Sequence, residues 1–204
     1  MTVWLHTHTQ TDADRHRHTY TDTHSQTHTH KHAHTHTHTH VRDNERAIVE
    51  VNGKKCFDKT LTAGQGKQVC GKGHNGWNED SMKITCTGAA VDGQFTVRVY
   101  TTLNSAANDE SFGIDNVVMK KVGDDNGGGS SSGGGGGSSG GMTANFDNGN
   151  MAGWSCDKIT TCGSFGKICG GYNTKAKSHE IKKTFKVDAG KYSIAFDFIK
   201  IDSW

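Results

Sequence analysis

The sequence contains no proline and few apolar residues, and both shortages limit what the chain can be. Without proline, the turns must be formed by Gly, Asn and Asp. Apolar residues make up 31% of the chain, a low share for a globular protein. No apolar run approaches the ~20 residues that a transmembrane helix needs. The formal net charge of +2 gives no argument for a nucleic-acid partner, so we expect neither a nucleic-acid-binding protein nor a membrane span.

Two low-complexity stretches divide the chain. Residues 6–40 are almost wholly His, Thr and other polar residues, and residues 123–141 are almost wholly Gly, Ser and Asp. Neither stretch can bury a core, so we expect disorder over residues 1–41 and a flexible linker over 123–141. Residues 42–122 and 142–204 then form two blocks that together are large enough for one sandwich-sized domain.

The first stretch is a histidine–threonine tract. It holds twelve of the fourteen histidines, mostly in strict alternation with threonine. Clustered imidazoles bind zinc, copper or nickel, which is the functional interpretation. An alternating CA dinucleotide repeat, however, encodes alternating His and Thr in any frame, and such repeats are common in non-coding DNA. We therefore interpret the tract as an extension of the gene model, whose metal affinity would follow from composition alone.

The cysteines fall three and three in the two blocks, with no CxxC pair. The missing CxxC argues against a zinc ribbon or a thioredoxin-like site. Gly-rich blocks of small apolar content suit a disulfide-supported extracellular domain, although no signal peptide is visible at residues 1–5. We expect disulfides from all six: Cys56, Cys70, Cys86, Cys156, Cys162 and Cys169. Short spacing favours Cys56–Cys70 and Cys156–Cys162, which leaves Cys86 and Cys169 to join the blocks, one of many connectivities.

Alternation of apolar and polar residues predicts antiparallel strands in both blocks. The segments are 47–51, 82–86, 95–101, 112–119, 181–187 and 192–201. The pair Asn52-Gly53 is a strong hairpin-turn signal, and no segment has a helical period with caps. The sequence therefore predicts an all-β fold, an antiparallel β-sandwich or jelly roll.

The segment 192–201 is long, apolar and close to the end of the sequence. Such a strand needs partners, because an unpaired apolar strand is an aggregation hazard. We expect its partners in residues 43–122, with strand 47–52 beside it.

Several motifs of the two blocks resemble a known repeat. In the later block they are Phe146-Asp147, Gly153-Trp154, Gly170-Gly171-Tyr172, Lys183-Thr184-Phe185 and residues 196–204; in the earlier block, Asp43-Asn44-Glu45, Val51-Asn52-Gly53 and residues 109–117. They resemble the two halves of a β-sandwich repeat of protist secreted or surface proteins and bacterial repeat adhesins. The halves stand in inverted order. The chain is therefore either a slice through a tandem array or one circularly permuted domain.

The resemblance also implies sites. In that repeat Asp-Ser-Trp is followed directly by Asp-x-Glu, so Trp204 and Asp43 would be the two sides of one loop. More distantly, the Gly-Trp opening and the Ile-Asp-Asn-Val ending are similar to carbohydrate-binding jelly rolls of the galactose-binding type. Such modules often hold a structural calcium ion, which here would lie at Asp147 and Asp115. The alternative is that Asp115 caps a turn and Asp147 is a solvated loop residue.

Acidic and aromatic residues would gather around that loop. They are Asp202, Trp204, Asp43 and Glu45, with Asp109 and Glu110 near the closing strand. An aromatic face with carboxylates suits sugar recognition, because the C–H face of a sugar stacks and its hydroxyls donate hydrogen bonds. The alternative is a buried tryptophan that pins a corner, with the acids in turns. Trp77 could be a second aromatic platform or a core residue.

These features lead to one leading function and two alternatives. We expect a non-catalytic extracellular or cell-surface β-sandwich module that binds glycans or mediates adhesion to surface or matrix partners. The alternatives are a purely structural spacer repeat and an accessory domain of an enzyme. Paired carboxylates could also suggest glycoside hydrolysis, but no catalytic signature surrounds them, so we expect no enzyme.

Overall fold

The computed structural model divides the chain into two units, residues 1–43 and 44–204. It describes residues 45–62, 65–71, 73, 77–123 and 141–204 with their side chains, and the backbone of residues 17–26 and 32–41. In the first unit β1 (Arg17–Gln26) and β2 (His32–Val41) form an antiparallel pair with a sheet of its own. The disorder expected over residues 1–41 stays a prediction. The sequence of the two strands is compatible with β-structure, because the His/Thr alternation has the two-residue period of a strand and β-branched threonine is enriched in strands.

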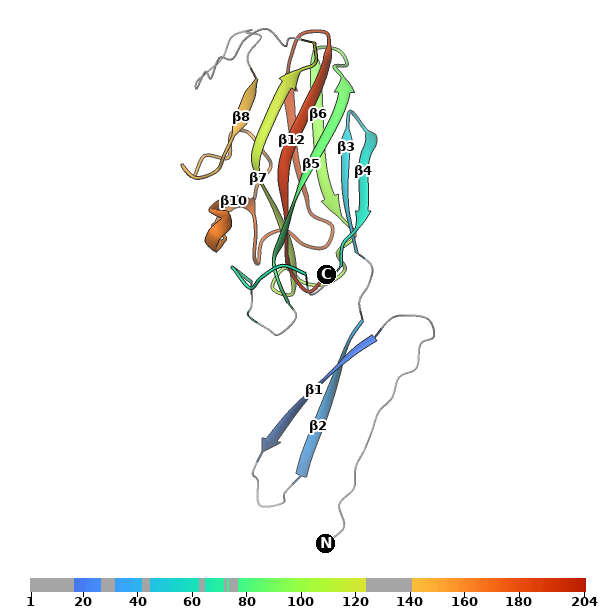
Figure 1. Cartoon of the computed structure of the whole chain (residues 1–204), viewed down its shortest axis with the longest axis vertical. Coiled ribbons are helices and arrows are strands. Elements are labelled where there is room, and N and C mark those ends of the chain that lie inside the picture. The colour runs from blue at the N-terminus through green and yellow to red at the C-terminus, as the bar shows by residue number, and fades with distance from the viewer. Residues whose placement is uncertain are drawn as a thin grey trace. The chain divides into compact units, whose positions relative to one another are not determined.

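The second unit is built from two antiparallel sheets (Figure 1). The first block supplies β3 (Arg46–Val51), β4 (Lys54–Thr60), β5 (Asp80–Ala89), β6 (Gln94–Thr101) and β7 (Glu110–Lys121). The second supplies β8 (Met142–Ala144), β9 (Ile159–Thr161), β10 (Lys167–Gly170), β11 (Glu180–Lys186) and β12 (Lys191–Asp202). The 3-10 turn η1 (Gly163–Phe165) is the only helical element among the described residues.

Both blocks contribute to both sheets. The six-stranded sheet has the order β5-β12-β7-β10-β9, with β8 also paired to β7, and the four-stranded sheet has the order β11-β6-β3-β4. Alternate side chains of the facing strands bury one core that includes Val49, Val97, Phe112 and Phe196. The predicted all-β fold is therefore confirmed. The period-two pattern gives each sheet one apolar face, and these two faces pack against each other.

Strand β12 lies between β5 and β7. It pairs with β5 from Lys191 to Lys200 and with β7 from Tyr192 to Asp202. The expectation of partners in residues 43–122 is confirmed, but the expected neighbour, strand 47–52, is wrong. That segment is β3, which lies between β6 and β4 in the other sheet.

Tight turns join successive strands at one end of the unit. The predicted Asn52–Gly53 turn joins β3 to β4, and both residues have positive φ (49° and 74°). Asp92 and Gly93 (49° and 69°) repeat this geometry between β5 and β6. Positive φ at both central residues is typical of the turn whose twist matches antiparallel strands.

All six cysteines are in disulfides, as expected, but the expected pairing is wrong. The bridges are Cys56–Cys86, Cys70–Cys162 and Cys156–Cys169, with Cα–Cα distances of 5.7, 4.7 and 5.4 Å. Cys56 on β4 reaches Cys86 on β5, so this bridge joins an edge of one sheet to an edge of the other. Only Cys70–Cys162 joins the two blocks. Sequence spacing failed because the pairing depends on which segments the fold brings together: the partners lie 30, 92 and 13 residues apart in the chain.

The outer face of the six-stranded sheet is covered where β12 ends. Ile199 and Ile201 point away from the main core and pack with Cys162 and Ile168, and the partly buried Val69, Cys70, Phe165 and Tyr172 surround them. The Cys70–Cys162 bridge joins the segment that carries Val69 to the segment that carries Phe165 and Ile168. It therefore holds both segments against the outer face of the sheet. No helix in the described part of the chain is long and apolar enough to span a bilayer.

The bridges are expected to differ in their contribution to stability. Cys70–Cys162 spans 92 residues of chain and Cys156–Cys169 spans 13. By the loop-entropy relation, replacing the first pair by alanine should cost roughly 4–5 kcal/mol of unfolding free energy and the second pair about 3 kcal/mol. Urea denaturation of both double variants, followed by tryptophan fluorescence, measures the difference. Equal losses, or a larger loss for Cys156→Ala/Cys169→Ala, would contradict this ranking.

Candidate functional site

Most of the predicted sugar-binding residues lie at the C-terminal corner, which we define as Glu45, the loop 102–111 and residues 202–204. Trp204 is 3% exposed. Its indole N–H donates to the carbonyls of Ser111 (3.0 Å) and Ile201 (3.2 Å), and its ring meets Phe198 edge to face at 5.7 Å. The platform interpretation of Trp204 is therefore corrected: the ring pins a corner of the core and presents no face to a sugar.

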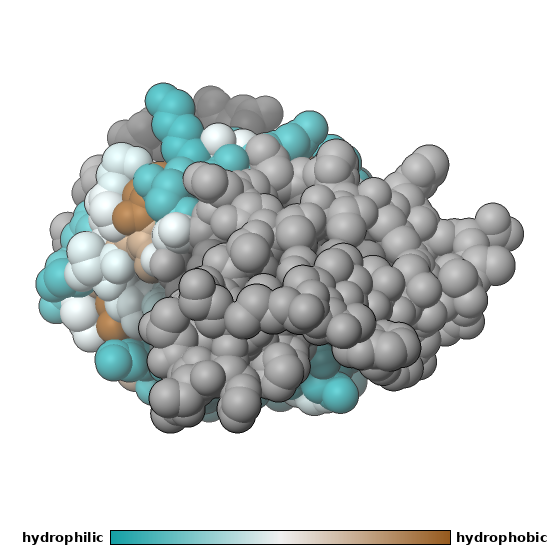
Figure 2. All heavy atoms as spheres, turned by 90° about the horizontal axis from the view of Figure 1, so that it is seen from below, coloured by the Kyte–Doolittle hydropathy of each residue, from teal (hydrophilic) through white to brown (hydrophobic). Residues whose placement is uncertain are grey.

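The backbone beside Trp204 is tied to the same loop. The Ser203 amide donates to the Asp109 carbonyl (3.3 Å), and the Ser203 hydroxyl lies 3.1 Å from that carbonyl and 3.4 Å from Asp109 Oδ1. Asp109 is half-buried, whereas Glu45 and Glu110 are buried. Asp43 lies outside the described residues. Among the coloured residues of Figure 2, seen from below, polar side chains predominate and apolar atoms are exposed only in small patches.

Glu45 and Glu110 form a buried carboxyl pair at this corner. Their carboxyl groups lie close enough for Glu45 to influence the titration of Glu110. Glu45 accepts the Asn104 amide (3.2 Å), and Glu110 accepts the Ser105 amide (3.1 Å). Burial raises the pKa of Glu110, and Glu45 and the Ser105 amide only partly oppose this rise. Both carboxyl groups are buried and accept backbone amides of the loop, so the pair holds the loop and presents no exposed acceptor to a sugar.

Asp202 faces a different set of groups. It is fully buried, with φ of 67°, and a Cβ atom on Gly71 would collide with the carboxylates of Asp202 and Glu79. Glu79 accepts the backbone amides of Val69, Cys70 (3.1 Å) and Gly71 (3.1 Å). Because three donors converge on it, Glu79 fixes the segment 69–71 against the end of β12. Asp202 is buried beside this segment, and its predicted ligand role stays a prediction.

Lys200 and Trp77 lie beside this segment. Lys200 is 2% exposed and donates to the Asn78 carbonyl at 2.7 Å. Burial lowers the pKa of Lys200, and the nearby Asp80, Glu79 and Asp202 oppose the shift. Trp77 is half-buried. The Asn78 contact fixes the backbone that follows Trp77, so Lys200 serves the same positioning purpose as Glu79.

The predicted calcium ligands, Asp115 and Asp147, lie close enough to influence each other. Asp115, on β7, is 4% exposed, and its Oδ1 is buried without a hydrogen-bond partner in the described part of the structure. Burial raises its pKa; the amides of Asn116 and Phe146 lower it, and the charges of Asp147 and Asp197 raise it again. No group of three or more His, Cys, Asp or Glu side chains among the described residues is arranged to hold a metal ion.

The unpaired oxygen is the one feature that fits a cation. Two carboxylates are too few to coordinate calcium alone, so backbone carbonyls and water would have to complete the shell. Asp147 Oδ1 already accepts the Lys167 amide (3.2 Å), and the Lys167 ammonium binds the Asp147 carbonyl (2.8 Å). Asp115 and Asp147 would therefore hold the ion from two elements, β7 and the loop after β8.

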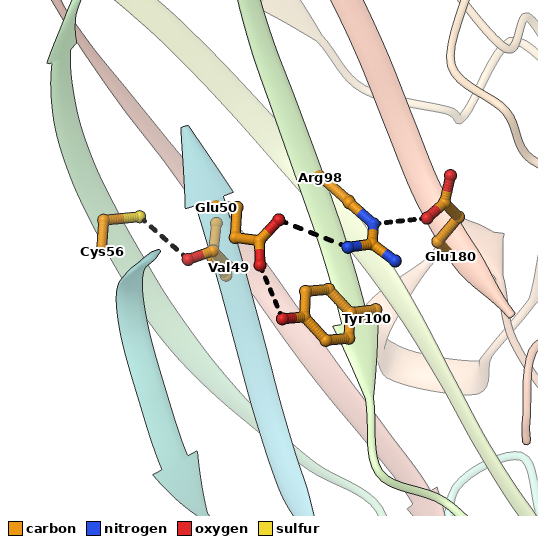
Figure 3. A network of polar contacts seen from close by, with 6 residues as sticks. All are labelled: Val49, Glu50, Cys56, Arg98, Tyr100 and Glu180. Carbon is orange, nitrogen blue, oxygen red and sulfur yellow. Dashed lines mark hydrogen bonds and ion pairs between the residues drawn. The ribbon is translucent and has the colours of Figure 1, made fainter. Parts of the chain in front are cut away.

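Sequence reasoning missed a polar network on the outward face of the four-stranded sheet (Figure 3). Arg98, on β6, binds Glu180 of β11 through Nε and Glu50 of β3 through Nη1 (3.3 Å). The Tyr100 hydroxyl donates to Glu50 (2.7 Å), and the Arg98 guanidinium lies 4.2 Å from the centre of the Tyr100 ring. We call Glu50, Arg98, Tyr100 and Glu180 the open-face cluster. The outward positions of the predicted strand 95–101 were the signal that could have found it.

Charge pairing holds this cluster in place. The Tyr100 hydrogen bond and Arg98 lower the pKa of Glu50, and Glu180 and Glu50 raise the pKa of Arg98. Cys56 Sγ, also drawn in Figure 3, lies 3.4 Å from the Val49 carbonyl. This sulfur is in a disulfide and has no proton to donate, so it makes only a packing contact. The cluster therefore consists of the four charged and aromatic side chains alone.

The chain shows no match to any model of a known protein family, to any curated protein or to any solved structure.

The buried pair at the C-terminal corner gives a pH prediction. Because folding raises the pKa of Glu110, the folded state binds more protons than the unfolded state between the two pKa values. The unfolding free energy should therefore fall as the pH rises through this window. Glu110→Gln removes the titrating carboxyl and keeps an oxygen that can accept the Ser105 amide, so it should flatten this fall. Chemical denaturation between acidic and neutral pH measures the effect.

The matched control is Asp188→Asn, which changes an exposed carboxylate and should leave the pH profile unaltered. A Glu110→Gln protein that keeps the wild-type pH dependence would show that Glu110 does not cause the fall in unfolding free energy.

Proposed function

We propose that residues 45–204 form a non-catalytic extracellular β-sandwich module that binds carbohydrate through the open-face cluster. Three disulfides support an extracellular setting, because such bonds persist in oxidising compartments. The cluster supports the binding role. We choose the open-face cluster over the C-terminal corner as the candidate binding site, because the tryptophan and most of the described acids of the corner are buried within the fold.

One observation carries the proposal: Arg98 and Glu180 keep binding capacity on an exposed sheet face. Each side chain is 40% exposed. Within the described residues, Arg98 Nη2 and Glu180 Oε1 have no hydrogen-bond partner, whereas Arg98 Nε, Arg98 Nη1 and Glu180 Oε2 are paired. A fixed donor beside a fixed acceptor suits adjacent sugar hydroxyls, which both accept and donate. The neighbouring Tyr100 ring adds an aromatic surface.

The rest of the face is polar and ordered by cross-strand pairs. Thr96 and Thr184 lie opposite each other on β6 and β11, and their hydroxyl oxygens are 2.9 Å apart. Arg46 and Lys55 bind Asp58 at 2.7 and 2.6 Å on the β3–β4 side. Side chains held in one geometry lose little conformational freedom when a ligand binds, which favours recognition of a rigid sugar ring.

A glycan array probed with the full chain tests this proposal. We expect binding that weakens about tenfold or more in Arg98→Ala and in Tyr100→Ala, since each removes a contact on the order of 1–2 kcal/mol. Asp109→Asn at the C-terminal corner is the matched control and should bind like the wild type. A folded protein that binds no glycan would refute the proposal. Loss of binding in Asp109→Asn alone would move the site to the corner.

A structural spacer is the second candidate. It is favoured by the corner, where Trp204, Glu45, Glu110 and Asp202 are all buried and the first three are hydrogen-bonded to backbone. A spacer needs such a corner but needs no ligand. A folded protein that binds no sugar would favour this role.

The proposal includes a structural calcium ion at Asp115 and Asp147. Calcium would bind the folded state only, so at about a hundredfold excess over its Kd it should add ~2.7 kcal/mol, which is roughly a 5–10 °C rise in Tm for a unit of this size. Asp115→Asn should abolish this rise. The same substitution should stabilise the calcium-free protein, because it removes a buried charge whose pKa is raised. Thermal melting with calcium and with chelator checks both effects, and an equal calcium response in Asp115→Asn would rule out the site.

A further inference from the structure

Exposed large apolar side chains gather at one end of the second unit. Among the described residues, four are exposed: Val91 (54%), Val122 (46%), Met142 (42%) and Met151 (37%). The first three lie at the end with the turns β3–β4, β5–β6 and β11–β12, at the opposite end of the unit from the C-terminus in Figure 1. We call this region, formed by residues 52–54, 89–94, 120–123, 141–142 and 186–191, the turn end.

Backbone contacts hold these segments together. The Ala90 amide donates to the Gly190 carbonyl (2.8 Å), the Val122 amide to Lys191 (2.7 Å) and the Val187 amide to Gly93 (2.9 Å). The Asn52 side chain donates to the Ala89 carbonyl (2.7 Å). Val91 and Val122 therefore lie on the two sides of the start of β12, on segments that are already ordered, so binding through them would cost little conformational entropy.

Lysines occur in the same segments as the exposed apolar side chains. Lys54, Lys120, Lys186 and Lys191 are exposed and Lys121 is half-buried, whereas the same segments contain only two acidic residues, Asp92 and Asp188. These segments therefore carry more positive than negative charge and also expose apolar side chains. Such a surface is complementary to an anionic interface with an apolar layer beneath it.

We propose that the turn end docks on an anionic lipid bilayer. Val91, Val122 and Met142 enter the boundary between headgroups and acyl chains, and the lysines bind the lipid phosphates and carboxylates. A neutral glycan is disfavoured here because these segments present no exposed aromatic ring. A polyanionic glycan would use the lysines but leave the apolar side chains in water. This surface is independent of the open-face cluster, so its test and the glycan test can fail separately.

Vesicle co-sedimentation of the full chain tests the proposal. Phosphatidylcholine vesicles with and without phosphatidylserine are compared at a pH of about 7.5, where histidine is mostly neutral, with chelator present. We expect binding to the anionic vesicles. Val91→Ser/Val122→Ser should weaken it about tenfold or more, and Lys120→Gln/Lys191→Gln roughly tenfold or more. The controls, Met151→Ser and Lys158→Gln/Lys177→Gln, change exposed residues of the same types elsewhere and should bind like the wild type.

Other outcomes would overturn the proposal. These are binding to neither vesicle, equal binding to both, or equal losses in the controls. Binding that depends on the lysines but survives Val91→Ser/Val122→Ser would identify a polyanion patch of the kind that sulfated glycans occupy. Far-UV circular dichroism of each variant confirms that the fold is retained.

Discussion

The pairing of β12 with β5 on one side and β7 on the other is the interaction on which the rest of the structure depends. β12 belongs to the second block, and both of its neighbours belong to the first. Its core-facing residues Ile194, Phe196 and Phe198 are fully buried, and its other face supplies Ile199 and Ile201 to a second cluster. Neither block can complete the six-stranded sheet without the other. The core is therefore formed from both blocks at once.

The end of β12 explains why so many polar groups are buried nearby. Once β12 is paired on both sides, Lys200, Asp202 and Trp204 at its end are buried. Each then needs a partner, because unsatisfied buried polar groups are costly. Asn78 accepts from Lys200, and Ser111 accepts from Trp204. Glu79 and Glu45 bind backbone amides of the adjoining segments. Glu45 and Glu110, two of the acidic residues that suggest a sugar site in the sequence, thus attach the irregular segment 104–105 to the sheet.

Local features of the fold could be predicted from the sequence, and long-range ones could not. Period-two alternation and Asn52-Gly53 depend on neighbouring residues, so strands such as 95–101 and the β3–β4 turn were found. The neighbour of β12 and the disulfide pairing depend on which strands meet in space, and spacing in the chain carries no information on that. Cys56 therefore pairs with Cys86 and not with Cys70.

The candidate site shows the same limit. A motif places Trp204 beside acids but cannot tell a buried ring from an exposed one, because both use aromatic and polar residues at a loop. Arg98 and Tyr100 alternate with buried valines, so their outward direction follows from the pattern. Their partners Glu50 and Glu180 come from strands 48 and 82 residues away, and only the sheet order brings them together.

The edges of the four-stranded sheet, β11 and β4, resist further pairing. β11 is one edge, and its Lys183 points inward, with its ammonium bound to the Ala152 carbonyl and 4.6 Å from the centre of the Phe185 ring. Burial lowers the pKa of Lys183, which shows that this cation is held at a cost. An inward charge on an edge strand discourages the addition of another strand. The opposite edge, β4, carries Lys54, Lys55 and Lys59 and is tied to the other sheet by Cys56–Cys86. With both edges protected, this sheet is closed to edge-to-edge pairing, and its outward face is the surface through which we propose that a ligand binds.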